Sequence, residues 1–82
     1  MGDNNIDILD MPYNYITEIA EEHGENIEEI AKALNVSPKR IRYILYYNYN
    51  TRKPKLKEKY RNIALAIHKG RYYYNIKKTM RQ

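Results

Sequence analysis

The chain contains no cysteine, phenylalanine or tryptophan, and only three glycines and three prolines occur among its 82 residues. Without cysteine it can form neither a disulfide framework nor a thiolate zinc site. Without Phe and Trp, the core must be built from Ile, Leu and Ala and from some of the ten tyrosines. A chain of this length has room for one hydrophobic core, so we expect a single domain.

Two further absences concern location. No apolar run approaches the length of a transmembrane helix. The first ten residues also carry acidic side chains where a secretory signal peptide carries basic ones. We therefore expect a cytoplasmic protein with no membrane partner.

Charge is divided sharply along the chain. Residues 1–31 contain nine acidic side chains and no Lys or Arg, whereas residues 32–82 contain all fifteen basic residues and one acid, Glu58. Such a basic half indicates a polyanionic partner. Alternatively, the two halves lie against each other in the fold. The acids Glu18, Glu21 and Glu22 would face away from a polyanion, which leaves them available to a protein partner.

Helix signals predict an all-α domain of four helices. Residues 1–11 form a flexible acidic terminus in this interpretation. Pro12 suits the first turn of a helix that ends at Gly24 in a left-handed conformation. The domain spans residues 12–70 and is followed by a basic, tyrosine-rich tail, residues 71–82, which could add a short C-terminal helix.

The middle of the chain carries the clearest signals. Asn26 is a good N-cap for residues 27–34, and Asn35 can end that helix with a positive φ. Ser37 caps a third helix over 38–47, a turn covers 48–53, and Pro54 opens a fourth helix that ends near Gly70. The expected buried stripes are Ile16, Ile19, Ala20 and His23; Ile27, Ile30, Ala31 and Leu34; Ile41, Ile44 and Leu45; and Leu56, Tyr60, Ile63, Ala64 and Ile67.

The two short helices over 27–34 and 38–47 predict a helix-turn-helix. The link of residues 35–37 is too short for antiparallel packing, so the helices must cross steeply. With Ile41, Ile44 and Leu45 inward, the opposite face of the third helix carries cations and tyrosines and no acid. We expect contacts with bases or the major groove of duplex DNA from Lys39, Arg42, Tyr43 and Tyr46.

Contacts with the DNA backbone are expected from polar and basic side chains on the surrounding segments. Cations at the start of a helix are repelled by the positive end of its dipole. Their presence there is easier to explain if phosphates lie nearby. The candidates are Asn26, Ser37, Arg40, Tyr47, Arg52, Lys53, Lys55, Arg71, Lys77, Lys78 and Arg81.

The apolar and cap positions of residues 26–45 resemble the headpiece of the lactose-repressor family of bacterial regulators. The pattern is Ile27, Glu29-Ile30-Ala31, Leu34, Val36-Ser37, Ile41 and Ile44-Leu45, with looser similarity through Pro54 to Asn75. The resemblance implies base contacts at the positions of Pro38, Lys39 and Tyr43, of which Lys39 and Tyr43 can donate. The family's minor-groove hinge positions hold Lys78 and Arg81, and its effector domain has no counterpart in these residues.

No catalytic set is visible, and we expect neither an enzyme nor a cofactor or metal site. His23 and His68 stand alone at helix ends, and the sequence has no glycine-rich phosphate loop. We therefore expect a nucleoid-associated, repressor-like regulator of the phage or mobile-element kind that binds duplex DNA as a homodimer. The alternatives are a protein-interaction module of helix-turn-helix shape and, more weakly, an RNA-binding protein.

Overall fold

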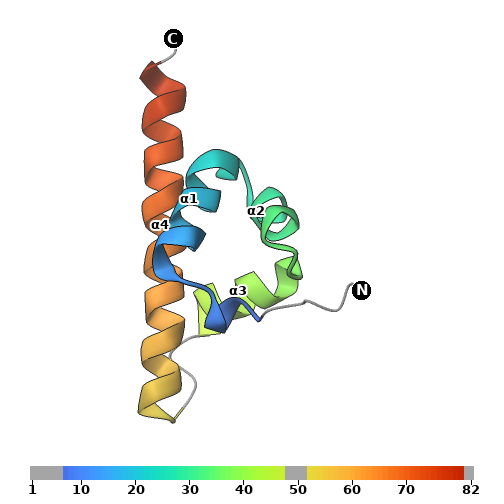
Figure 1. Ribbon diagram of the computed structural model, residues 1–82, viewed down its shortest axis with the longest axis vertical. Helices are drawn as coiled ribbons and strands as arrows, with labels where there is room; N and C mark the ends of the chain where they lie inside the picture. The colour runs from blue at the N-terminus through green and yellow to red at the C-terminus, as the bar shows by residue number, and fades with distance from the viewer. Residues whose placement is uncertain (1–6, 48–51, 81–82) are drawn as a thin grey trace.

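The structure, a computed structural model, describes residues 7–47 and 52–80 (Figure 1). The expected all-α fold is confirmed, and the described residues contain no strand. A 3-10 helix η1 (Ile8–Asp10) precedes α1 (Tyr13–His23), α2 (Ile27–Leu34), α3 (Pro38–Tyr47) and α4 (Pro54–Met80). None of the described helices is long and apolar enough to cross a membrane.

Local polar groups define the α2–α3 pair as the sequence predicts. The Asn26 side chain accepts a hydrogen bond from the Glu29 backbone N–H at 2.9 Å, which fixes the start of α2. Asn35 ends α2 in the left-handed region, at φ 59°. Ser37 Oγ then accepts from the backbone N–H of Lys39 at 3.1 Å. These caps turn the chain within three residues, and α3 leads away from α2 toward α4 (Figure 1).

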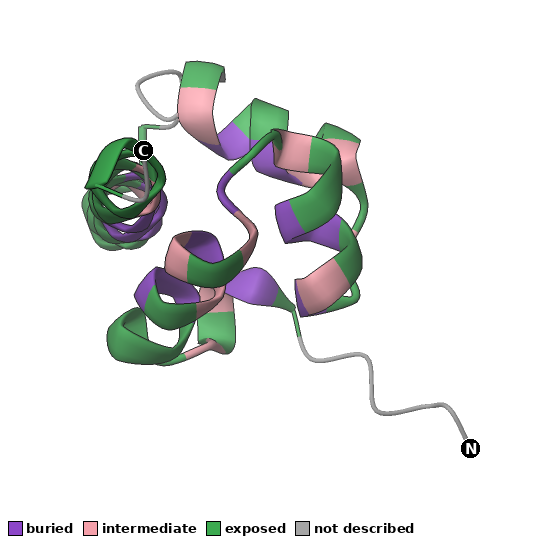
Figure 2. Cartoon of the chain, turned by 90° about the horizontal axis from the view of Figure 1, so that it is seen from above, coloured by how far each residue is buried: buried purple, intermediate pink, exposed green. Residues whose placement is uncertain are grey.

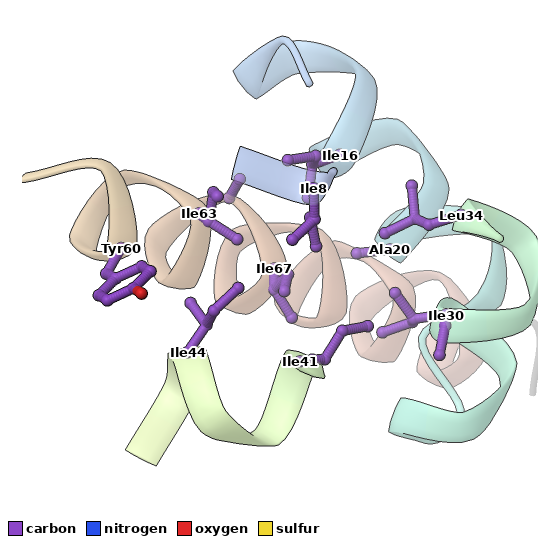
Figure 3. Packing of buried hydrophobic residues seen from close by; sticks show 12 residues of the cluster. Ile8, Ile16, Ala20, Ile30, Leu34, Ile41, Ile44, Tyr60, Ile63 and Ile67 are labelled. Atoms are coloured by element: carbon purple, nitrogen blue, oxygen red, sulfur yellow. The ribbon is translucent and has the colours of Figure 1, made fainter. Parts of the chain in front are cut away.

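The core collects one buried stripe from every helix. Ile67 of α4 lies between Ile41 and Ile44 of α3 on one side and Ile8 and Ile16 on the other (Figure 3). All five side chains have no exposed surface. The expected stripes are confirmed at their central positions, while the flanking residues Ile19, His23, Ile27, Leu45 and Leu56 are only partly buried.

Two glycines do not have the roles that the sequence suggests. The predicted helix end at Gly70 is wrong, because α4 continues without a break to Met80. A Cβ on Gly70 would lie 2.4 Å from Ala20 Cβ and 2.5 Å from the Thr17 carbonyl oxygen. Gly24 does follow α1, but its φ is −74° rather than positive, and a Cβ there would lie 2.8 Å from Tyr74 Cβ. Both glycines therefore permit close approach of α1 and α4.

The N-terminal boundary also differs from the expectation. Pro12 is the N-cap of α1 rather than its first residue, with an extended backbone at ψ 144°. Residues 7–11, expected to belong to a flexible terminus, contain η1, and Ile8 enters the core. A segment of five residues is too short to show a helical or strand period, which is why sequence patterns missed it.

Candidate nucleic-acid interface

The outward face of α3 is basic and aromatic. Lys39, Arg42, Tyr43 and Tyr46 are all exposed, whereas Ile41 and Ile44 on the opposite side have no exposed surface. The structure thus brings together the four residues expected to contact bases or the groove. Tyr47 belongs to α3, but its side chain lies outside the described residues.

A shallow, open hollow lies on this face. It is lined by Ser37, Lys39, Arg40, Arg42 and Tyr43 of the turn and α3, and by Tyr60 of α4. The ring of Tyr43 meets that of Tyr60 edge to face, with centroids 6.0 Å apart. Because Tyr60 is almost fully buried, this contact anchors the exposed Tyr43 ring to the core.

Two cations of the hollow already have carboxylate partners from the acidic half. Arg40 Nη2 lies 3.0 Å from Asp7 Oδ2, and Arg42 forms an ion pair with Glu28 of α2. Partial burial alone would lower the pKa of Arg40, but Asp7, aided by the Tyr60 hydroxyl, raises it. Neither acid was included among the sequence candidates, because each pair depends on how distant segments pack. Among the described residues, Lys39 has no ion-pair partner.

The pKa of Glu28 lies below its usual 4.5, first because a backbone N–H donates to its carboxylate and then because of Arg42. Both interactions favour the charged form, so their stabilisation is present above about pH 4.5 and is lost as pH falls through the lowered pKa.

We expect Arg42→Ala to raise the pKa of Glu28 only partly, because the backbone hydrogen bond remains. An NMR titration of the Glu28 carboxyl measures the shift. A pKa restored fully to 4.5 would contradict the order of causes.

The two helix-cap residues proposed to contact the DNA backbone use their oxygens within the protein. Asn26 Oδ1 is the acceptor at the start of α2, and Ser37 Oγ is the acceptor at the start of α3. The Asn26 amide N–H₂ group and the Ser37 hydroxyl hydrogen can still donate outward. Both caps therefore remain compatible with a contact to an anionic oxygen.

The predicted backbone contacts near the start of α4 gather in a second open hollow. It is lined by Arg52, Lys53, Pro54, Lys55, Leu56 and Lys59. Tyr60, which touches Tyr43 of α3, lies fewer than two helical turns from Lys55. The start of α4 thus adds positive charge close to α3.

The remaining candidates lie at the other end of α4. Arg71 Nε donates to the Gly24 carbonyl at 3.4 Å, and Lys77 forms an ion pair with Glu21 of α1. Lys77 lies 17 residues beyond Tyr60, or about 25 Å along the helix. Arg71, Lys77 and Lys78 are therefore not brought together with the cations of α3, while Arg81 lies outside the described residues.

These ion pairs partly explain why acidic residues are concentrated in one half of the chain and basic residues in the other. Asp7, Glu21 and Glu28 from the acidic half each contact a cation from the basic half.

No group of three or more acidic, His or Cys side chains in the described ranges could hold a metal ion. Comparisons of the chain with protein-family models, curated proteins and solved structures found no match.

Proposed function

We propose that the protein binds double-stranded DNA as a repressor-like transcriptional regulator, with α3 in the major groove. The observation that carries this proposal is the outward face of α3, where Lys39, Arg42 and Tyr43 surround one open hollow. None of the residues of α3 is acidic. Lys and Arg can donate to guanine O6 and N7, and a tyrosine hydroxyl can donate to a phosphate.

The position of α3 supports the same proposal. Its buried side is held against α4 by Ile41 and Ile44, so its outer side is presented by a rigid element. The basic residues at the start of α4 would lie along the adjacent phosphate backbone. The resemblance of residues 26–45 to the lactose-repressor headpiece agrees with this assignment. A DNA-binding regulator of this kind would act in the cytoplasm, on the nucleoid.

The double variant Lys39→Ala/Arg42→Ala tests the proposal. We expect it to bind a labelled duplex at least about tenfold more weakly, because one good base contact contributes about 1–3 kcal/mol. Titrations at two salt concentrations should also show that the affinity of the variant depends less on salt. The slope of log affinity against log salt concentration should decrease in magnitude by about one for each phosphate that the variant no longer neutralises. Lys77→Ala/Lys78→Ala removes the same charge at the far end of α4 and should change affinity less.

Each outcome of the titration has a distinct meaning. Wild-type protein without salt-dependent duplex binding would refute the proposed function. Equal decreases in affinity for the two double variants would indicate that total charge, rather than α3, controls binding. A protein-interaction module is the second candidate. It is favoured by the pairing of Arg40 with Asp7 and of Arg42 with Glu28, which leaves fewer cations for phosphates.

A further inference from the structure

The ion pair between Arg42 of α3 and Glu28 of α2 joins the outward face of α3 to the neighbouring helix. On both helices, exposed residues lie on the outside of the fold and buried residues face its interior (Figure 2). The Arg42 side chain keeps 45% of its surface and lines the open hollow together with Lys39 and Tyr43. Arg42 is therefore held by a carboxylate and accessible to a ligand at the same time.

The Glu28 carboxylate is itself held by two hydrogen bonds. Glu28 belongs to the first turn of α2, where a backbone N–H donates to its carboxylate, and Arg42 Nη2 donates to its Oε2. The backbone hydrogen bond is local to α2 and does not depend on Arg42. An exposed ion pair adds little to stability, but it restricts the rotamers of a long side chain. The main effect of Glu28 is therefore on where the Arg42 guanidinium lies.

Pairing with Glu28 does not use up the hydrogen-bonding capacity of Arg42. The planar guanidinium carries N–H donors on all of its nitrogens, and the carboxylate accepts from one of these, Nη2. Two parallel N–H groups are enough to reach O6 and N7 of a guanine in the major groove. A guanidinium that is already fixed in the free protein also loses less rotamer freedom when it binds.

The neighbouring carboxylate also determines which part of a duplex suits Arg42. A phosphate that approached the guanidinium would come close to the Glu28 carboxylate as well, and the two anions would repel each other. Guanine O6 and N7 are neutral acceptors, so they meet no such repulsion. An arginine paired with a carboxylate is therefore better suited to a base edge than to the phosphate backbone.

We propose that Glu28 is a positioning residue for base recognition, which holds the Arg42 guanidinium so that it donates to O6 and N7 of one guanine. This inference rests on the proposed DNA binding and adds to it the base that Arg42 contacts and the acid that orients it. Glu28 makes no contact with DNA in this arrangement, and its effect passes through Arg42. Tyr43, anchored by its contact with Tyr60, is the adjacent fixed side chain on the same face.

The first test is whether Arg42 contacts a base. Duplexes that the wild-type protein selects from a randomised pool define the preferred site, and each base pair of that site is then changed in turn. Arg42→Ala should remove the preference for guanine at one position, by about 5- to 150-fold, the usual contribution of a bidentate contact. Equal weakening on every duplex is typical of a phosphate contact. That result would overturn the inference and leave the proposed function intact.

Removing the carboxylate should change base preference and total affinity in opposite directions. Glu28→Ala should lower the preference for that guanine by about two- to tenfold, because the guanidinium is no longer held before binding. The same variant should bind a duplex without the site more tightly, since one negative charge near the phosphates is gone. An unchanged guanine preference in Glu28→Ala would contradict a positioning role.

Glu29→Ala is the matched control for Glu28→Ala. It removes an exposed acid from the same first turn of α2, and Glu29 forms no ion pair within the described ranges. We expect Glu29→Ala to raise affinity for a duplex without the site and to leave the guanine preference unchanged. A guanine preference lowered equally by both variants would mean that charge near α2, rather than the contact with Arg42, is responsible.

The position of the effect within the site separates orientation of Arg42 from a general structural role. Glu28→Ala should lower the preference only at the guanine that Arg42 contacts, and Glu28→Gln, which keeps an oxygen acceptor, should restore most of it. A loss spread over every position would indicate displacement of the whole of α3 and would refute the inference. Wild-type protein without salt-dependent duplex binding would instead remove the proposed function, and this inference with it.

Discussion

Replacing Gly70 with alanine is expected to lower the free energy of unfolding by about 1–3 kcal/mol. In the interior of an ordinary helix the same change is stabilising, by roughly 1 kcal/mol. Here the new Cβ would lie 2.5 Å from the carbonyl oxygen of Thr17 and 2.9 Å from the backbone nitrogen of Glu21. Because backbone cannot swing aside as a flexible side chain does, α1 and α4 must separate. Urea denaturation measures the decrease.

Two companion variants isolate the cause. Asn75→Ala changes an exposed position of α4 and should be neutral or slightly stabilising, as helix propensity alone dictates. The double variant Gly70→Ala/Ala20→Gly removes the Cβ that lies 2.4 Å from the new one, so its loss of stability should be smaller than the sum of the losses of the two single variants. A Gly70→Ala protein more stable than wild type would show that the two helices are not in such close contact.

Replacing Ile8 with alanine is expected to destabilise the fold by about 2–5 kcal/mol, the usual range for a buried isoleucine. The free energy of unfolding of a small domain is about 5–15 kcal/mol, so the effect is large. Ile8 has no exposed surface and belongs to the same cluster as Ile16 and Ile67. Thermal or urea unfolding followed by circular dichroism measures the change.

Leu9 provides the matched control for Ile8. It belongs to the same short helix, η1, but is only partly buried against the core. Leu9→Ala should therefore cost clearly less than Ile8→Ala. Equal effects, or a wild-type stability for Ile8→Ala, would mean that the segment before α1 does not contribute to the core.

The parts of the fold that depend on local chemistry could be predicted from the sequence. Asn26, Asn35 and Ser37 fix the ends of α2 and α3 through hydrogen bonds and a backbone conformation that involve only neighbouring residues. Gly70 could not be interpreted in this way. A glycine that ends a helix and a glycine that lets two helices touch look alike in a sequence, and only the position of α1 distinguishes them.

The same division holds for the candidate site. Helical periodicity is enough to put Lys39, Arg42 and Tyr43 on the outward face of α3, since Ile41 and Ile44 fix its inward side. Periodicity gives no information on partners from other segments. The ion pair of Arg42 with Glu28 depends on the packing of α2 beside α3, so the sequence could not predict it. The hydrogen bond from Arg71 to the Gly24 carbonyl depends in the same way on the packing of α1 against α4.

The close packing of α1 against α4 has a consequence for synthesis of the protein. Most of the packing contacts of α1 are with α4, and Ala20 packs against Gly70, which the ribosome adds about fifty residues later. At about 5–20 residues per second, the ribosome needs several seconds to supply that partner. Meanwhile the emerging half carries nine acids and no Lys or Arg before residue 32. Mutual repulsion among nascent chains should keep them apart until α4 is complete.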